Sequence, residues 1–273
     1  MRMYIWLILL AAPPLPTDAY LDLVRQGPSP SYAKIRNDTF RTLTTDPLFR
    51  RRVTENSLTR VLNAVAWKLH DADEARVNGW QSPPSIGHAP PLSLTGSPPS
   101  RSDDNHPARD GQSDSGGAAP LGVGYVQGMN VLAAPFLYAA RSEVQAFAAF
   151  STFVSTQCPG YIRGGAMSGV HRGLALVDRA LAVVDPRLAT YLLGKGMTAE
   201  IYAFASVLTF CACTPPLPEV LGLWDFLFAY GPHLNLLCIV AQLVLIRDQI
   251  LSNPRFDHSI PALHGAAVLM SCE

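Results

Sequence analysis

Helical spacing is clearest in residues 46–69, which read DPLFRRRVTENSLTRVLNAVAWKL. Asp46 before Pro47 is a typical helix start, because an Asp side chain caps free backbone amides and Pro suits the first helical turn. Apolar residues then recur at helical intervals, at Leu58, Leu62, Val65 and Leu69. The pattern predicts a helix after Asp46 that turns one face toward a hydrophobic core.

Similar signals extend through the rest of the chain. Ser142 with Gln145 three residues later forms a capping-box pattern, and Asp185 before Pro186 is another helix start. Further expected helices cover residues 186–194 with Gly194 as the C-cap, residues 218–230 closed by Gly231, and residues 234–251. Alternating strand patterns are few, so the sequence predicts an all-α fold.

Composition limits the function classes. The chain has 273 residues, of which 48% are hydrophobic and 15% charged, with 21 basic and 21 acidic side chains. This length suffices for one large domain or two small ones. Zero net charge argues against non-specific nucleic-acid binding, which needs a basic surface. A charged fraction below the usual value of about 25% indicates a surface that meets a partner.

Residues 81–120 differ from the rest. They hold 8 Pro, 8 Ser and 5 Gly among 40 residues, with no Phe, Trp or Tyr. Such a segment cannot bury enough apolar surface to offset the entropy lost on ordering. We interpret it as a disordered insertion within a domain, and a linker between two domains is the alternative.

No familiar cofactor or metal motif stands out. Gly122, Gly124 and Gly128 miss the dinucleotide-binding spacing by one residue, and no phosphate-binding GxxxxGK[ST] exists. The seven histidines are scattered, and the spacing of Cys211 and Cys213 suits neither zinc nor redox chemistry. These cysteines are expected to be buried thiols. The sequence predicts no cofactor, metal or nucleotide site of its own.

Two apolar segments bear on targeting. Residues 1–12, MRMYIWLILLAA, are similar to a secretory signal, although the following Pro13-Pro14 suits cleavage poorly. The longest internal apolar run, residues 236–246, is too short to span a bilayer. No membrane-spanning helix is expected.

Two polar segments stand apart from the helical background. Residues 35–42, IRNDTFRT, place Asp38 and Arg41 three apart, so that on a helix the carboxylate can orient the guanidinium. Residues 124–130, GYVQGMN, place Gln127 beside a glycine ahead of an apolar helix. On the residues alone, a surface ion pair and a turn residue are the simpler interpretations, and the spacing does not bring the two segments together.

Four motifs, which follow one another along the chain in the family's order, resemble the TBC domain, a family of GTPase-activating proteins for Rab-like GTPases. IxxDxxR at Ile35, Asp38 and Arg41 and YxQGM at residues 125–129 are similar to its two signature motifs. Residues 2–10 and residues 223–231, LWDFLFAYG, are similar to its first motif and its WD…G motif. Residues 34–41, 208–216 and 223–236 are similar to a fungal subgroup, the activator of the spindle-position checkpoint that restrains mitotic exit and septation.

The resemblance implies that the chain is not itself an enzyme. It would supply Arg41 as an arginine finger and Gln127 as a glutamine finger to a Rab- or Ras-like small GTPase, which holds the GTP and Mg²⁺. Asp38, Tyr125 and Gly128 would support the fingers. A scaffold subunit and a cytoplasmic location at the spindle pole body are implied too. The competing interpretation is a non-catalytic TBC-like module that recruits the GTPase or a scaffold without stimulating hydrolysis.

The expected organisation has four parts. They are an N-terminal part of the domain with the arginine finger at 1–80, the disordered insertion at 81–120, the remainder with the glutamine finger at 121–250, and a divergent tail at 251–273. The last helices of the family's domain are expected to be missing. Trp6, Trp224 and Asp225 are expected to have structural roles, and the run Arg50-Arg51-Arg52 to form a solvated helix face.

Overall fold

The computed structural model describes residues 1–14, 17–44, 46–77, 124–162, 167–214 and 216–252. Every regular element in these ranges is a helix, which confirms the predicted all-α class. The helices before residue 78 are α1 (Arg2–Leu9), α2 (Thr17–Arg25), α3 (Tyr32–Thr39), α4 (Pro47–Arg52) and α5 (Glu55–Val77). Those that follow are α6 (Met129–Ala139), α7 (Glu143–Thr152), the π-helix η1 (Phe153–Gln157), α8 (Pro159–Ile162), α9 (Ser168–Val184), α10 (Pro186–Gly194), α11 (Ala199–Tyr202), α12 (Phe204–Thr209), α13 (Leu217–Tyr230), the 3₁₀-helix η2 (Pro232–Leu234), α14 (Asn235–Leu245) and α15 (Arg247–Ser252).

Helix starts lie where the local sequence signals predict them. Asp46, Ser142 and Asp185 each accept a hydrogen bond from an amide in the first turn of their helix, at 2.9 to 3.4 Å. Asp46 also makes a tertiary contact, because its Oδ2 accepts from the buried amide of Leu217 at 3.0 Å. This residue therefore starts α4 and ties it to α13.

Two expected helices are each divided in two. The helix predicted after Asp46 ends at Arg52, because the buried residue Val53 is extended (φ −115°, ψ 122°). Thr54 then starts α5 by accepting a hydrogen bond from the amide of Ser57 at 3.1 Å. The helix predicted over 234–251 breaks at Ile246, which separates α14 from α15 and has a buried side chain.

The end of α10 also differs from the prediction. Gly194 is the last helical residue and not the cap, whereas Gly196 takes the left-handed conformation (φ +72°) that a glycine adopts without steric strain. Gly231 closes α13 as expected, with φ +127°.

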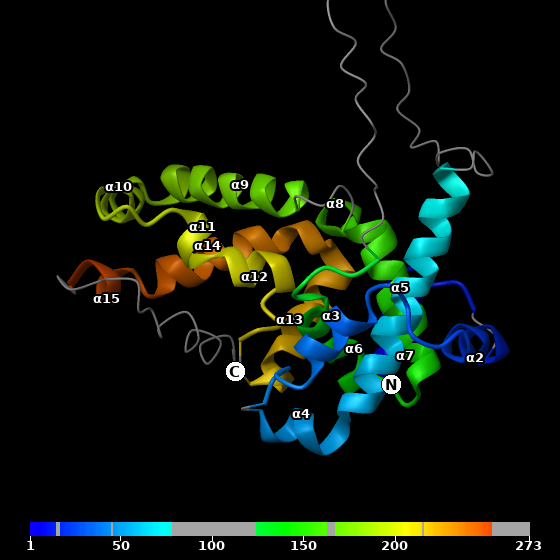
Figure 1. Ribbon diagram of the computed structural model, residues 1–273. Coiled ribbons are helices and arrows are strands. Elements are labelled where there is room, and N and C mark those ends of the chain that lie inside the picture. The colour runs from blue at the N-terminus through cyan, green and yellow to red at the C-terminus, as the bar shows by residue number, and fades with distance from the viewer. Residues whose placement is uncertain (15–16, 45, 78–123, 163–166, 215, 253–273) are drawn as a thin grey trace, which may run out of the picture.

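The helices enclose two hydrophobic cores. The first draws on α1, α5, α6, α7 and α13, so it joins segments that precede and follow residues 78–123. Its centre is aromatic, and the ring centroids of Trp6, Phe136 and Trp224 lie 5.1 to 5.8 Å apart. The second lies among α9, α10, α12, α14 and α15. Figure 1 shows α9 and α10 along one side of the molecule and α5 and α7 on the other.

The first helix belongs to the first core. Trp6 is fully buried, and its indole nitrogen donates to Asp225 Oδ1 at 2.7 Å. Arg2 pairs with the same carboxylate at 2.9 Å, while Trp224 donates to the carbonyl of Phe210 at 2.8 Å. These contacts confirm the expected structural roles of Trp6, Trp224 and Asp225, and residues 2–9 are an element of the folded domain.

Three further predictions concern an arginine run, membrane-spanning helices, and the segments at 81–120 and 251–273. The side chains of Arg50, Arg51 and Arg52 are exposed, and the Arg52 guanidinium lies over the Tyr138 ring at 5.2 Å from its centroid. No helix in the described ranges combines the length and the apolarity needed to cross a bilayer. The insertion predicted at 81–120 lies outside the described residues, as does the tail predicted at 251–273 except for its first two residues.

Candidate functional site

The segment that carries Arg41 is held by a buried carboxylate. Asp38 lies in the last turn of α3 and is 5% exposed. Arg41 follows in the turn after the helix, and its Nη2 donates to Asp38 Oδ1. The Arg41 side chain is 54% exposed. One nitrogen of the guanidinium is thus anchored on a buried carboxylate, while much of the side chain is exposed to solvent.

The turn at residues 124–130 is fixed by two glycines. A Cβ on Gly124 would lie 2.9 Å from the carbonyl oxygen of Ala66, so this glycine lets the turn approach the backbone of α5. Gly128 has φ +100°, and a Cβ there would lie 2.8 Å from Cδ2 of Leu208 on α12. Gln127, between these fixed points, has an exposed side chain. The turn thus packs closely against α5 and α12 on the two sides of Gln127.

A buried tyrosine joins the two segments. Tyr125 is 2% exposed, and its hydroxyl donates to Asp38 Oδ2 at 2.9 Å across 87 positions of sequence. Burial, and then the hydrogen bond to Asp38, raise the pKa of the Tyr125 hydroxyl above its ordinary value. The hydroxyl therefore stays protonated and donates a hydrogen bond to the carboxylate. Asp38 thus contacts Arg41 through one oxygen and Tyr125 through the other.

Two members of this cluster were not predicted from the sequence. Asn130, in the first turn of α6, and Thr42, just after Arg41, are both buried and hydrogen-bonded to each other at 2.9 Å. Asn130 follows the quoted motif directly, but an Asn at the start of an apolar helix is usually a local turn or capping residue. Its hydrogen-bond partners Asp38 and Thr42 lie 92 and 88 positions away in the sequence, so the residues around Asn130 do not indicate them.

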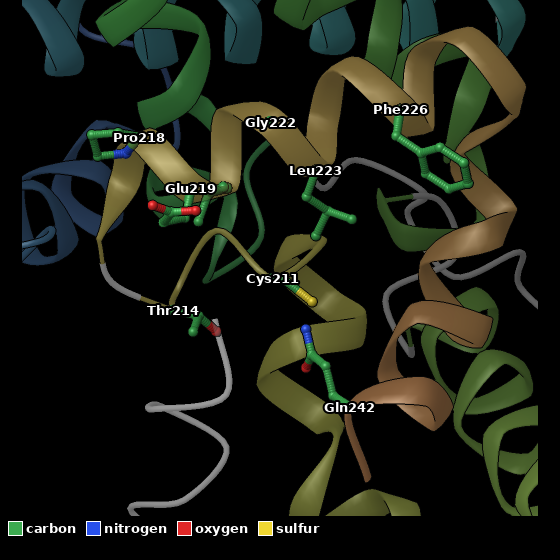
Figure 2. Close-up of a pocket in the computed structure, with 9 residues that line it drawn as sticks. Cys211, Thr214, Pro218, Glu219, Gly222, Leu223, Phe226 and Gln242 are labelled. Atoms are coloured by element: carbon green, nitrogen blue, oxygen red, sulfur yellow. The ribbon is translucent and has the colours of Figure 1, made fainter. Parts of the chain in front are cut away.

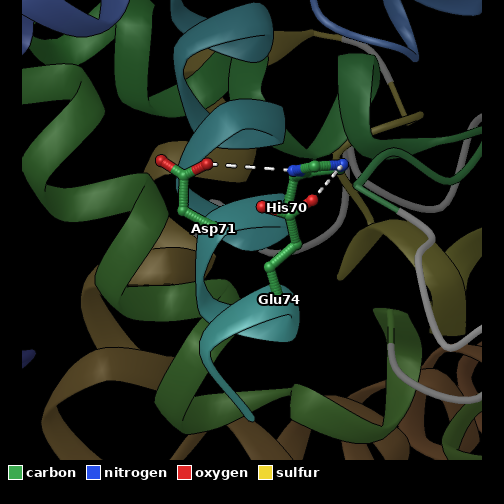
Figure 3. A group of neighbouring side chains, drawn as sticks. All are labelled: His70, Asp71 and Glu74. Carbon is green, nitrogen blue, oxygen red and sulfur yellow. Dashed lines mark ion pairs between the residues drawn. The ribbon is translucent and has the colours of Figure 1, made fainter. Parts of the chain in front are cut away.

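One group of potential metal ligands occurs among the described residues. His70, Asp71 and Glu74 lie on α5, with donor atoms within 4.8 Å of one another (Figure 3). His70 Nδ1 lies 3.8 Å from the Asp71 carboxylate, and its Nε2 lies 3.8 Å from that of Glu74. Both carboxylates are largely exposed. Side chains at adjacent helical positions diverge, so three ligands from one helix do not enclose an ion. We interpret the group as neighbouring polar side chains on the surface of α5.

A cavity of about 330 Å³ lies between α13 and α14 (Figure 2). Gly222, Leu223 and Phe226 line it from α13, and Gln242 lines it from α14. Neither Arg41 nor Gln127 contributes to its wall. The two turns therefore form a candidate site that is separate from this cavity.

The cysteines differ in burial. Cys158 and Cys211 are buried, and desolvation raises the pKa of both thiols. Cys213 is half-buried, so the expected burial is met only in part for the pair at 211 and 213. The Cys211 thiol donates to Asn235 Oδ1 at 3.3 Å, which suits a structural role.

Comparisons with known proteins agree on one family. Residues 120–251 match the family model of the Rab-GTPase-TBC domain. The chain is 44% identical over 253 residues to cell division control protein 16 of Schizosaccharomyces pombe, covering 93% of this chain and 67% of that protein. It is 35% identical over 252 residues to mitotic check point protein BUB2 of Saccharomyces cerevisiae, covering 91% of this chain and 69% of that protein.

Solved structures agree on the fold. The crystal structure of the Chlamydomonas flagellar RabGAP TBC domain superposes with a TM-score of 0.65 at 18% sequence identity. The match covers 97% of this chain and 72% of that chain. At this low identity the likeness establishes the helical architecture alone.

Proposed function

This chain belongs to the Rab-GTPase-TBC domain family, and from that premise we propose that it stimulates GTP hydrolysis by a Rab- or Ras-like small GTPase. Arg41 and Gln127 are the two side chains that it supplies to the partner. One observation carries the proposal: both side chains are exposed on turns that share a single buried hydrogen-bonded cluster. An activator that works in trans needs side chains that reach the partner and a rigid backbone that holds them in position.

The chemistry of GTP hydrolysis fits these two residue types. The reaction spreads negative charge over the transferred phosphoryl group and needs a water molecule held in line with it. The Arg41 guanidinium neutralises the developing charge, a contribution worth about 10³–10⁵ in rate when arginine is supplied in this way. The Gln127 amide carries both a donor and an acceptor, so it orients the attacking water. GTP and Mg²⁺ remain bound to the GTPase.

The relatives suggest the cellular setting. Two of them are named as a cell division control protein and a mitotic check point protein. From these names, and from the resemblance of residues 34–41, 208–216 and 223–236 to the spindle-position checkpoint activator, we propose that the activity operates in control of mitotic exit or septation, in the cytoplasm at the spindle pole body, with a scaffold subunit. The charge-poor composition, 15% charged residues, is consistent with a surface covered by such a subunit.

Single-turnover hydrolysis tests the proposal. The full chain is mixed with each member of a panel of Rab- and Ras-like GTPases loaded with GTP, and phosphate release is measured. On the GTPase that responds most, we expect Arg41→Ala and Gln127→Ala each to lower the stimulated rate by at least about 10²-fold. If both variants stimulate as well as the wild type does, the two fingers are wrongly assigned.

The chain offers matched controls for both substitutions. Arg25 on α2 pairs with Asp22 at 2.9 Å in the same i, i+3 arrangement as Arg41 and Asp38, and the exposed Gln26 follows it. Arg25→Ala and Gln26→Ala should leave the stimulated rate unchanged. A wild-type chain that binds a GTPase of the panel and stimulates none would instead be the non-catalytic recruiting module.

A further inference from the structure

Asn130 reaches the turn that carries Arg41. Its side chain is 5% exposed, and its Nδ2 donates to Thr42 Oγ1 at 2.9 Å and to the carbonyl of Asp38 at 3.4 Å. The Thr42 hydroxyl donates in turn to the same carbonyl at 3.0 Å. Asp38 and Thr42 flank Arg41 on both sides, so this amide group fixes the backbone from which the guanidinium extends.

The other end of the same amide reaches the turn that carries Gln127. Asn130 Oδ1 accepts a hydrogen bond from the backbone amide of Gly128 at 3.2 Å. It also lies 3.3 Å from the Tyr125 hydroxyl, whose single proton has the closer acceptor Asp38 Oδ2 at 2.9 Å. Gly128 is the residue next to Gln127, so Asn130 holds the turn at the position where the second side chain emerges.

Only a carboxamide makes both sets of contacts from one position. It presents two N–H donors on one side and an acceptor oxygen on the other. Aspartate has no donor for Thr42, and it would add a second buried carboxylate beside Asp38. Leucine and alanine would leave the amide of Gly128 without its partner.

We propose that Asn130 is the positioning residue that holds both fingers in register with each other, a role that rests on the proposed function. It does not touch the GTPase or the nucleotide. It acts through the backbones of residues 38–42 and 125–128, so that Arg41 and Gln127 enter the partner's site as a unit. Losing it leaves the hydrogen bond from Tyr125 to Asp38 as the link that still joins the two turns. The turns can then shift relative to each other, and a displacement of about 1 Å in such positioned groups lowers rates by about 10²-fold.

A second buried asparagine provides the matched control. Asn63 on α5 is 6% exposed and also bridges backbone groups, accepting from the amide of Ser29 at 2.9 Å and donating to the carbonyl of Gly27 at 2.8 Å. Neither of these hydrogen bonds involves residues 38–42 or 125–128. Asn130→Ala and Asn63→Ala should therefore lower the thermal midpoint of the full chain by similar amounts, while only Asn130→Ala affects catalysis.

The readout is the dependence of single-turnover hydrolysis on activator concentration, with the most strongly stimulated GTPase of the panel. For Asn130→Ala we expect the maximal rate to fall about 10- to 100-fold, with the half-saturating concentration changed by less than about threefold. Asn63→Ala should keep the maximal rate. In an Arg41→Ala, Gln127→Ala background, adding Asn130→Ala should lower the rate no further, because the residue acts through the fingers.

Thr42→Val provides a second variant, since it removes the partner of Asn130 Nδ2 while keeping the shape of the side chain. We expect it to lower the maximal rate about tenfold. The proposal is overturned if Asn130→Ala and Thr42→Val both match Asn63→Ala in maximal rate while Arg41→Ala and Gln127→Ala lose theirs. If the two finger variants also keep their rates, the proposed function is wrong as well.

Discussion

The conformation of Gly128 allows a quantitative test of the turn that carries Gln127. Gly128→Ala places a side chain on a residue with φ +100° and ψ −19°, outside the regions that alanine prefers. That conformation costs an alanine about 1–2 kcal/mol. The added Cβ would also lie 2.8 Å from Cδ2 and 3.2 Å from Cγ of Leu208. Leu208 is only partly buried and can shift, so the steric cost is at the low end of overpacking, about 1 kcal/mol.

These contributions predict that Gly128→Ala lowers the free energy of unfolding by about 2–3 kcal/mol. The assay is urea unfolding of the full chain, with the free energy extrapolated linearly to water. Gly222→Ala is the matched control, because this glycine lies within α13 and a Cβ there meets no atom within 4 Å. It should stabilise the chain by about 0.5–1 kcal/mol, since alanine has the higher helix propensity.

The double variant Gly128→Ala, Leu208→Ala separates strain from steric overlap. Leu208→Ala removes the atoms that the new Cβ would meet, so the Gly128 substitution should be less destabilising in that background by about 1 kcal/mol. A Gly128→Ala chain within about 0.5 kcal/mol of the wild type would refute the reasoning, because neither a left-handed turn nor the contact with Leu208 could then be present.

Three other predictions concern the frame around the site. Asp46→Ala should lower the free energy of unfolding by about 2–4 kcal/mol in urea, because it removes the cap of α4 and leaves the buried amide of Leu217 unpaired; a loss below about 0.5 kcal/mol would contradict this. The pKa of Asp185 is lowered by hydrogen bonds from the α10 amides and by an arginine, so its stabilisation is complete above a pH of about 4 and is lost as the pH falls through its lower folded value. The difference in thermal midpoint between wild type and Asp185→Asn should therefore shrink from pH 7 to pH 3. Equal differences at the two pH values would contradict a stabilising role of the ionised Asp185 carboxylate. Cys158 and Cys211, whose thiol pKa values are raised by burial, should resist alkylation at pH 8 until the chain unfolds, as mass spectrometry can show; labelling in the native chain would contradict their burial.

Local features of the fold follow from local sequence. Asp46, Ser142 and Asp185 start helices because their side chains bond to amides two or three residues away, an interaction visible in the sequence itself. The break at Ile246 does not follow from such a signal, and the one at Val53 does so only in part, because Thr54 caps the helix that follows it. Both residues are apolar and continue the periodic pattern, and both are buried by contacts with distant helices. Tertiary packing therefore sets the boundary at Ile246, and at Val53 it acts together with the local cap from Thr54.

The candidate site shows the same division. The pair of Asp38 and Arg41 follows from a spacing of three on a helix, but the bond from Tyr125 to Asp38 spans 87 positions. Residues alone gave no reason to join them, and the prediction that the two motifs act together came from family resemblance. Asn130 was missed because its bonds to the other turn depend on how α6 packs against α3.

The contrast between the buried carboxylate of Asp38 and the exposed side chain of Arg41 has a consequence for how Arg41 can act. Asp38 is a nearly buried carboxylate, so losing its cationic partner during the reaction would leave it poorly compensated. A guanidinium has five N–H donors, and the hydrogen bond to Asp38 uses Nη2 alone. The remaining donors are free to meet a phosphoryl group while the anchor stays in place. The tyrosine hydroxyl donates to the other carboxylate oxygen throughout. Arg41 can thus reach toward a partner without unpairing the group that orients it, and the wide planar fork of a guanidinium suits this role better than the compact ammonium of a lysine.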